Sequence, residues 1–265
     1  MLKKRPVFRR QGRGLMTKVE HGVLCEFMDM PLGSADQVMD HFGALEGAVR
    51  RGRGGEAFVY VPGQRRDRVV LVAHADTVWD GDMRDRAAGH SYQEKDGVIS
   101  STTFGVGLGA DDRAGCAILW ILRDLGHSLL VTSGEETGTQ GARWLMSINS
   151  DISSELNGGH QFMVEFDRRN ARDFKCYGVG TDEFRQYLRE VTGYSEPDRS
   201  SSTDITVLCR SICGVNLSVG YRDEHSAYET LVLKDWHHTL DMARNWLSTN
   251  DLPRFPLGRG QAVAC

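Results

Sequence analysis

The sequence lacks the features that mark most membrane and secreted proteins. No stretch of the 265 residues approaches the roughly eighteen consecutive apolar residues that a transmembrane helix needs. The basic N-terminus, MLKKRPVFRRQGRG, is not followed by the apolar segment of a secretory signal. We therefore expect a cytoplasmic protein without a membrane partner. An arginine-rich targeting role for this arm stays open, as does a natural start at Met16.

Other classes of site are also missing. The six cysteines are scattered without a C-x-x-C pair, so we expect isolated reduced thiols rather than a thiolate zinc knuckle. The glycine-rich GVGLG at 105–109 leads into two aspartates, which would repel a phosphate group. With 32 basic and 36 acidic residues the net charge is −4, and we expect no nucleic-acid partner.

The sequence does contain enough apolar material for one sizeable core. A hydrophobic content of 40% over this length suits a single globular domain, although two small domains would also fit. We assign residues 17–250 to one domain, residues 1–16 to a flexible basic arm and residues 251–265 to a C-terminal tail.

Strand and helix patterns alternate along the chain. Continuous apolar runs such as VVLVA are typical of strands covered on both faces. The strands expected from these patterns are 57–61, 68–73, 98–101, 127–132, 162–166, 174–177 and 214–219. The expected helices are 18–30, 34–49, 112–125, 140–146, 182–191, 204–209 and 233–247, and residues 80–96 read as a loop. This alternation predicts an α/β fold with a mostly parallel central sheet flanked by helices on both faces.

Acidic residues and histidines stand where the expected strands end. Ligands of open α/β sheets bind beyond the carboxyl ends of the strands, so these positions are candidates for a site. Each alone has an ordinary structural explanation, such as a helix cap, a solvated turn or a surface ion pair. The residues are His74 and Asp76, Asp111 and Asp112, Glu135 and Glu136, Asp167, and His225 with Glu229.

Together these side chains predict a metal centre. Two histidines and four or five carboxylates at one sheet edge would repel one another unless cations neutralised them. Imidazole with carboxylate suits zinc, with cobalt, manganese or iron as competitors. The number of ligands fits two divalent ions that share one carboxylate at a separation of about 3.5–4 Å. The remaining histidines show no metal-ligand spacing, and we expect them to be structural or exposed.

Five motifs in chain order resemble those of the co-catalytic di-zinc exopeptidases. They are HADTV, GLGADDRAG, TSGEETGTQGA, EFD and H-S-x-x-E. That superfamily includes the bacterial leucyl aminopeptidases, peptidase T and the carboxypeptidase G type enzymes, and the resemblance covers roughly residues 18–248. It implies a zinc exopeptidase, or phosphorylase/hydrolase-like, fold and metal-dependent hydrolysis of amide bonds.

The resemblance also implies a role for each matching residue. The metal ligands would be His74 and Asp167 for one ion, Glu136 and His225 for the other, and Asp111 as the bridge. Glu135 would be the general base, Asp76 would orient a metal-bound histidine, and the peptide bond before Asp112 would be cis.

The layout leaves the substrate class and the oligomeric state open. Many relatives of the peptidase T type insert a second domain between the third carboxylate and the last histidine. The segment between Asp167 and His225 is too short for that domain, so the chain resembles the compact catalytic core. The sequences of the motifs GADDRAG and EETGTQGA nevertheless resemble those of the relatives with two domains more closely.

Three further residues are candidates for substrate contacts. Ser202 and Asp204 belong to a serine-rich turn, from Ser200 to Asp204, that either lines a pocket or caps a helix. Arg222 either holds a substrate carboxylate or forms a surface ion pair with the acidic pair Asp223 and Glu224.

We expect a zinc-dependent exopeptidase, an aminopeptidase or dipeptidase that acts on short peptides. The alternative is a carboxypeptidase or an N-acyl amino acid deacylase with the same metal site, and a more distant one is a non-catalytic binding protein. A free amine needs an acidic anchor, whereas a substrate carboxylate needs an arginine or lysine.

Overall fold

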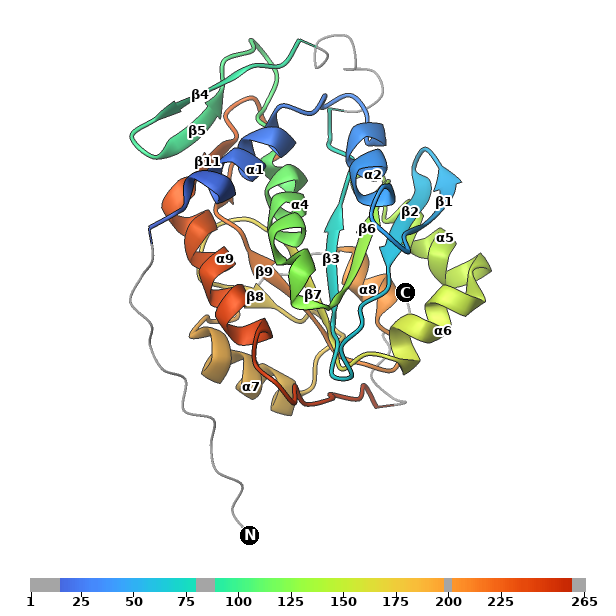
Figure 1. The fold of residues 1–265 in the computed structure, drawn as a ribbon. Coiled ribbons are helices and arrows are strands. Elements are labelled where there is room, and N and C mark those ends of the chain that lie inside the picture. Colours follow the sequence, from blue (N-terminus) through green and yellow to red (C-terminus); the bar gives the residue numbers. More distant parts are fainter. Residues whose placement is uncertain (1–14, 80–88, 198–201, 259–265) are drawn as a thin grey trace.

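The computed structural model describes residues 15–79, 89–197 and 202–258. Seven strands form the central sheet: β1 (Val49–Arg53), β2 (Glu56–Val61), β3 (Val70–His74), β6 (Ser128–Thr132), β7 (Met163–Arg168), β8 (Phe174–Lys175) and β9 (Gly214–Ser218). Their order is β1-β2-β6-β3-β7-β9-β8 (Figure 1). The four inner strands β6, β3, β7 and β9 are parallel, and the outer strands pair antiparallel. The predicted mostly parallel sheet is confirmed.

Helices cover both faces of this sheet. They are α1 (Lys18–Met28), α2 (Asp36–Gly43), α4 (Ala110–Leu122), α5 (Gln140–Ile148), α6 (Ser150–Gly158), α7 (Asp182–Thr192), α8 (Asp204–Leu208) and α9 (Leu233–Leu247), with a short 3-10 turn η2 (Arg123–Leu125). Helix α4 packs on β3 and β7 beneath α1, while α5 packs on β2 and against α8 (Figure 1). A capping box fixes the start of α1, because Thr17 accepts from the Glu20 backbone and the Glu20 carboxylate accepts from the Thr17 backbone.

A second, antiparallel sheet lies beside the carboxyl edge of the first. It contains β4 (Tyr92–Lys95), β5 (Val98–Ser101), β10 (Tyr221–Arg222) and β11 (Thr230–Val232), in the order β10-β11-β5-β4. The β10–β11 pair anchors both ends of the loop that carries His225 and Glu229. This small sheet therefore positions two of the candidate site residues.

The inner strands have the burial that their sequences predict. All five residues of β3 and all five of β6 are buried, as expected for apolar strands between two helix layers. Among the described cysteines, Cys25 is partly exposed and four are buried, and all five are free thiols.

Several predicted boundaries are wrong. The helix expected over 34–49 ends at Gly43, and β1 follows it as an edge strand. The expected loop 80–96 contains the exposed strand β4. The sequences VRRGR and YQEK lack apolar alternation, so their strand pairing depends on the neighbours β2 and β5. Helix α6 and the short strands β10 and β11 were likewise not expected.

The two chain ends differ in how much is described. Residues 1–14 of the expected arm and 259–265 of the expected tail lie outside the described residues. Residues 251–258 pack onto the domain, with Leu252, Phe255 and Leu257 buried. The Phe255 ring lies 4.9 Å from the ring of Phe184.

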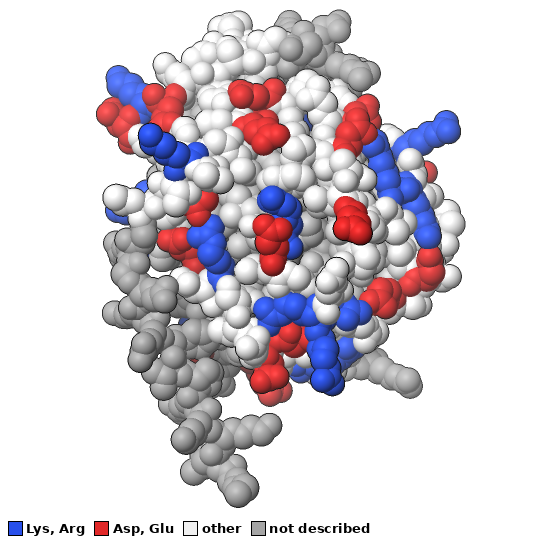
Figure 2. Space-filling view, in the orientation of Figure 1, with Lys and Arg blue, Asp and Glu red and all other residues white. Residues whose placement is uncertain are grey.

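The surface shows no single dominant charge on the face in view. Acidic and basic side chains are interspersed there (Figure 2). Within the described part of the chain, none of the helices combines the length and apolarity required to cross a bilayer.

Candidate metal centre

The parallel strands bring the predicted residues to one edge. His74 is the last residue of β3, Glu135 and Glu136 follow β6, and Asp167 lies near the end of β7. Because β3, β6 and β7 are parallel neighbours, their carboxyl ends meet. His225 reaches the same edge from the loop after β10. We call His74, Asp111, Glu136, Asp167 and His225 the sheet-edge cluster.

Asp111 stands between the two histidines. Its Oδ1 lies 3.0 Å from Nε2 of His74, and its Oδ2 lies 3.1 Å from Nε2 of His225. It is held at the irregular start of α4 by the left-handed Gly109 (φ 71°) and by a cis peptide bond to Asp112. One carboxylate thus presents a separate oxygen to each imidazole, as a bridging ligand would.

The other two carboxylates each join one of these histidines. Asp167 Oδ1 lies 3.4 Å from Nε2 of His74, and Glu136 Oε2 lies 3.0 Å from Nε2 of His225. The second oxygen of Glu136, Oε1, is buried and has no hydrogen-bond partner among the described residues. Ligand atoms of His74, Asp111 and Glu136 lie within 4.8 Å of one another, as do those of His74, Asp112 and Asp167. These groups could hold metal ions.

In the metal-free chain, the neighbouring carboxylates favour the protonated form of both histidines of the sheet-edge cluster. Hydrogen bonds to Asp111 and Glu136 raise the pKa of His225 to about 11, although burial opposes the shift. Burial works against the charged form of His74 as well, but the charge of Asp167 and a hydrogen bond to Asp111 raise its pKa well above the usual value. Cations of either kind, protons or metal ions, are therefore favoured here.

Asp76 contacts both His74 and the loop that carries Glu135 and Glu136. Its two carboxylate oxygens accept from the backbone N–H groups of Glu135 (3.2 Å) and Glu136 (3.1 Å). Nδ1 of His74 lies 3.0 Å from the Asp76 carbonyl oxygen and 3.4 Å from its carboxylate. Burial would raise the pKa of Asp76, but the bonds to His74 and the two N–H groups outweigh burial and lower it. Asp76 thus contacts His74 through Nδ1, and Nε2 of the same ring faces Asp111 and Asp167.

The two adjacent glutamates diverge. Glu136 points to His225, whereas Glu135 lines a 150 Å³ cavity together with Tyr177 and Ser202. Burial, with the charge of Asp167 adding to it, raises the pKa of Glu135 to about 9 in the metal-free chain. Glu135 therefore keeps its proton at neutral pH in the metal-free chain, and cations bound to the neighbouring carboxylates would lower its pKa again.

Sequence reasoning named Glu229 without giving it a role, and it missed the two hydroxyl groups that contact Asp167. The buried Glu229 accepts from the backbone N–H groups of Gly109 (2.6 Å) and Asp111 (2.9 Å) and so fixes the turn that carries Asp111. Tyr221 and Thr203 donate to the two oxygens of Asp167, at 3.1 and 2.9 Å. Glu229 had a signal, its place in H-S-x-x-E. The hydroxyl donors had none, because their contacts depend on tertiary packing.

The predicted substrate contacts have different surroundings. Ser202 lines the 150 Å³ cavity, whereas Asp204 is buried and accepts from Thr132. Burial raises the pKa of Asp204 to about 7. Ser200 and Ser201 lie outside the described residues.

The predicted ion pair between Arg222 and Asp223 or Glu224 is wrong. The Arg222 guanidinium lies 3.3 Å from Asp235 on α9, and Glu224 pairs instead with Arg169 at 2.7 Å. Neighbouring positions on a short strand and its loop point to different sides, so adjacency in sequence did not give the pairing.

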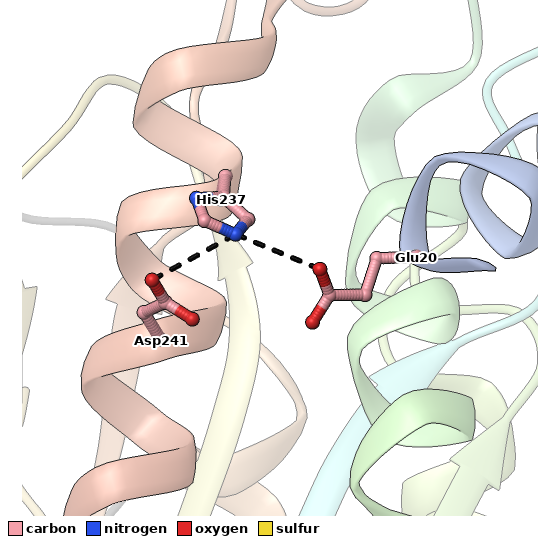
Figure 3. Close-up of side chains that lie close together, drawn as sticks. All are labelled: Glu20, His237 and Asp241. Carbon is pink, nitrogen blue, oxygen red and sulfur yellow. Dashed lines mark ion pairs between the residues drawn. The ribbon is translucent and has the colours of Figure 1, made fainter. Parts of the chain in front are cut away.

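A second group with metal-ligand geometry lies between α1 and α9 (Figure 3). Nε2 of His237 lies 3.6 Å from Glu20 and 3.7 Å from Asp241, one helical turn further along α9. Arg244 donates to both carboxylates, at 3.0 Å to Asp241 and at shorter range to Glu20. We call Glu20, His237, Asp241 and Arg244 the α1–α9 cluster. Its two acidic groups already have two basic partners.

Comparisons with known proteins find similarity in structure only. No family model matches the sequence, and no curated protein matches it. Aminopeptidase PepT from Bacillus cereus superposes with a TM-score of 0.60 at 13% identity, over 86% of this chain and 97% of that one. A tripeptidase from Staphylococcus aureus gives 0.56 at 12%, over 87% and 98%.

An archaeal protein extends the same result. Aminopeptidase APDkam598 from Desulfurococcus kamchatkensis gives a TM-score of 0.61 at 12% identity, over 87% of this chain and 94% of that one. The chain therefore has the same fold as these two aminopeptidases and this tripeptidase. At these identities the similarity shows the fold alone.

Proposed function

We propose that this chain is a metal-dependent exopeptidase that hydrolyses amide bonds of short peptides. The observation that carries the proposal is Asp111, whose two oxygens face the Nε2 atoms of His74 and His225 at 3.0 and 3.1 Å. The fold shared with aminopeptidases and a tripeptidase supports the same reaction class.

The residues present fit a pair of divalent metal ions. His74, Asp111 and Asp167 would hold one ion, and Asp111, Glu136 and His225 the other. Zinc suits this mixture of imidazole and carboxylate, and cobalt or manganese would be accepted by the same donors. The unpartnered buried Oε1 of Glu136 supports the assignment, because a buried carboxylate oxygen without a partner is costly.

The reaction follows from what the chain's own groups can do. When bound, the metal ions would supply a water of lowered pKa and stabilise the oxyanion that develops on the substrate carbonyl. Glu135 would accept the proton of the attacking water and return it to the leaving nitrogen. Asp76 would keep Nε2 of His74 directed at the cluster, and Glu229 would hold the turn that carries Asp111.

An aminopeptidase or dipeptidase is the first candidate for specificity. The 150 Å³ cavity beside Glu135 contains Glu224, whose carboxylate lies outside the proposed metal ligands and would receive a free amine in exchange for its partner Arg169. A carboxypeptidase or N-acyl amino acid deacylase is the second, because a larger cavity beside Glu136 contains the arginines Arg50 and Arg53.

A substrate panel tests the proposal. The zinc-loaded protein would be assayed, with and without chelator, on a peptide with a free amine, its N-acetylated form, and an N-acyl amino acid. We expect chelator-sensitive release of an amino acid from the first. Hydrolysis of none of the three by protein that contains metal would refute the enzyme assignment.

A further inference from the structure

A second, larger cavity opens on the other side of the sheet-edge cluster. Its volume is 630 Å³, within the range of small-ligand pockets. Glu136 and Asp76 line this cavity, together with Arg50, Arg53 and Gly54 of the β1–β2 hairpin. A substrate with its scissile bond at Glu135 and Glu136 would extend into one or both of the two cavities.

The hairpin is fixed against the loop that carries the two glutamates. The Ser133 backbone N–H donates to the Ala57 carbonyl at 3.0 Å. A Cβ atom on Gly134, the residue before Glu135, would lie 2.6 Å from the carbonyl oxygen of Gly55. The two backbones therefore touch, and only glycine fits where they do. The backbone of the hairpin is consequently held close to the loop that carries Glu135 and Glu136.

The arginines of the two cavities differ in what they already bind. In the smaller cavity Arg168 pairs with Asp173 and Arg169 pairs with Glu224. In the larger cavity Arg50 pairs with Asp40 and lies 3.8 Å from Asp36.

Arg53 is different. Among the described residues its guanidinium has no acidic partner, although Glu56 is directly opposite it in the hairpin register. The other arginines of the two cavities each have an acidic partner within the described chain, whereas Arg53 has none there.

We propose that Arg53 binds a free carboxylate of the substrate on the leaving-group side of the scissile amide. This inference rests on the proposed function. A guanidinium takes a carboxylate through two parallel N–H···O bonds, and the fixed hairpin presents Arg53 to the larger cavity. The free amine then occupies the smaller cavity, beside Glu224. The substrate class is thus a short peptide with both termini free, whose C-terminal carboxylate binds to Arg53.

Paired substrates test Arg53. The zinc-loaded enzyme would be assayed on leucyl-glycyl-glycine and on its C-terminal amide. We expect the wild type to prefer the free acid in kcat/KM by about tenfold or more, as the loss of a charge-assisted bond predicts. Arg53→Gln should remove most of that preference, and Arg53→Lys should leave an intermediate one because it keeps the charge but loses the bidentate geometry.

Arg51→Gln is the matched control. Arg51 lies two residues earlier on β1 but binds Asp151 and Asn149, so its substitution should leave the preference at the wild-type value. An Arg53→Gln variant with the full wild-type preference would overturn the proposal, as would a wild type that hydrolyses acid and amide equally. In both of these cases the exopeptidase assignment stands. Absence of chelator-sensitive hydrolysis of either peptide would instead refute the proposed function and this inference with it.

Discussion

The sheet-edge cluster and the α1–α9 cluster contain the same kinds of residue in different states of charge balance. In the α1–α9 cluster, the guanidinium of Arg244 pairs with both Glu20 and Asp241, and Nε2 of His237 lies 3.6 and 3.7 Å from the same two carboxylates. In the sheet-edge cluster, the ion pairs that the described chain gives to Asp111, Glu136 and Asp167 are all with the two imidazoles. Asp76 and Glu135 add further acidic groups beside it.

The difference shows that residue type and separation do not by themselves define a metal site. A guanidinium fixed between two carboxylates offsets part of their negative charge. It therefore weakens the electrostatic attraction of the site for a divalent ion. Where histidine is the basic partner, a proton can exchange for a metal ion, because the metal binds the deprotonated imidazole. We therefore expect the proposed metal binding at the sheet-edge cluster and a structural role for the α1–α9 cluster.

The largest expected effect is a loss of activity without a loss of metal, at a residue beside the sheet-edge cluster. Glu135→Gln should keep the metal content and lower kcat by about 10³-fold, because the amide cannot accept the proton of the attacking water. Steady-state kinetics with elemental analysis checks both. Glu46→Gln, at an exposed loop position, is the control. Full activity of Glu135→Gln would remove this residue from the mechanism.

The next effect compares the two clusters directly. Asp111→Asn should lower the metal content from about two ions per chain to less than one, because the bridging ligand serves both ions. His237→Ala should leave the content unchanged. Inductively coupled plasma mass spectrometry after zinc incubation measures both variants. Loss of one ion in His237→Ala would show that the α1–α9 cluster binds metal despite Arg244.

A smaller effect concerns stability alone. Arg244→Met should lower the free energy of unfolding by about 1–2 kcal/mol, since it leaves two partly buried carboxylates without their guanidinium. Urea denaturation measures it, with Arg189→Met, on the exposed face of α7, as the control. Adding Glu20→Gln should recover part of the loss. Unchanged stability in Arg244→Met would mean that the pair contributes nothing to joining α1 and α9.

The smallest effect is a pH dependence of the metal-free protein. Bonds to Asp111 and Glu136 raise the pKa of His225 to about 11 in the folded chain, against about 6.5 in the unfolded chain. The stabilisation is therefore complete below about pH 6.5 and is lost progressively as the pH rises toward the folded value. Because the side chain is half exposed, we expect less than about 1 kcal/mol between pH 7 and 9.

Differential scanning calorimetry measures this dependence. The melting temperature of the metal-free wild type should fall more between these pH values than that of His225→Gln. Equal slopes in the two proteins would contradict the assignment of the dependence to His225.

The parts of the molecule that were predictable are those that one sequence segment determines. The inner strands were found because continuous apolar runs such as VLVAH mark strands buried on both faces. The sheet-edge residues were brought together by one rule, that parallel strands share a carboxyl edge. Neither step requires knowledge of which side chains touch.

The parts that were missed depend on contacts between distant segments. Strand β1 is a strand because β2 pairs with it, not because VRRGR favours one. Arg222 pairs with Asp235 across the structure rather than with its sequence neighbours. Glu20 and His237 come from opposite ends of the chain, so no local spacing could have indicated the α1–α9 cluster.

The most direct test of the account is an anomalous diffraction map of zinc-soaked crystals, collected at the zinc absorption edge. We predict two peaks about 3.5–4 Å apart, one beside each oxygen of Asp111, the first near His74 and the second near His225. No peak is predicted between Glu20, His237 and Asp241. A map with density at the α1–α9 cluster and none beside Asp111 would contradict the account.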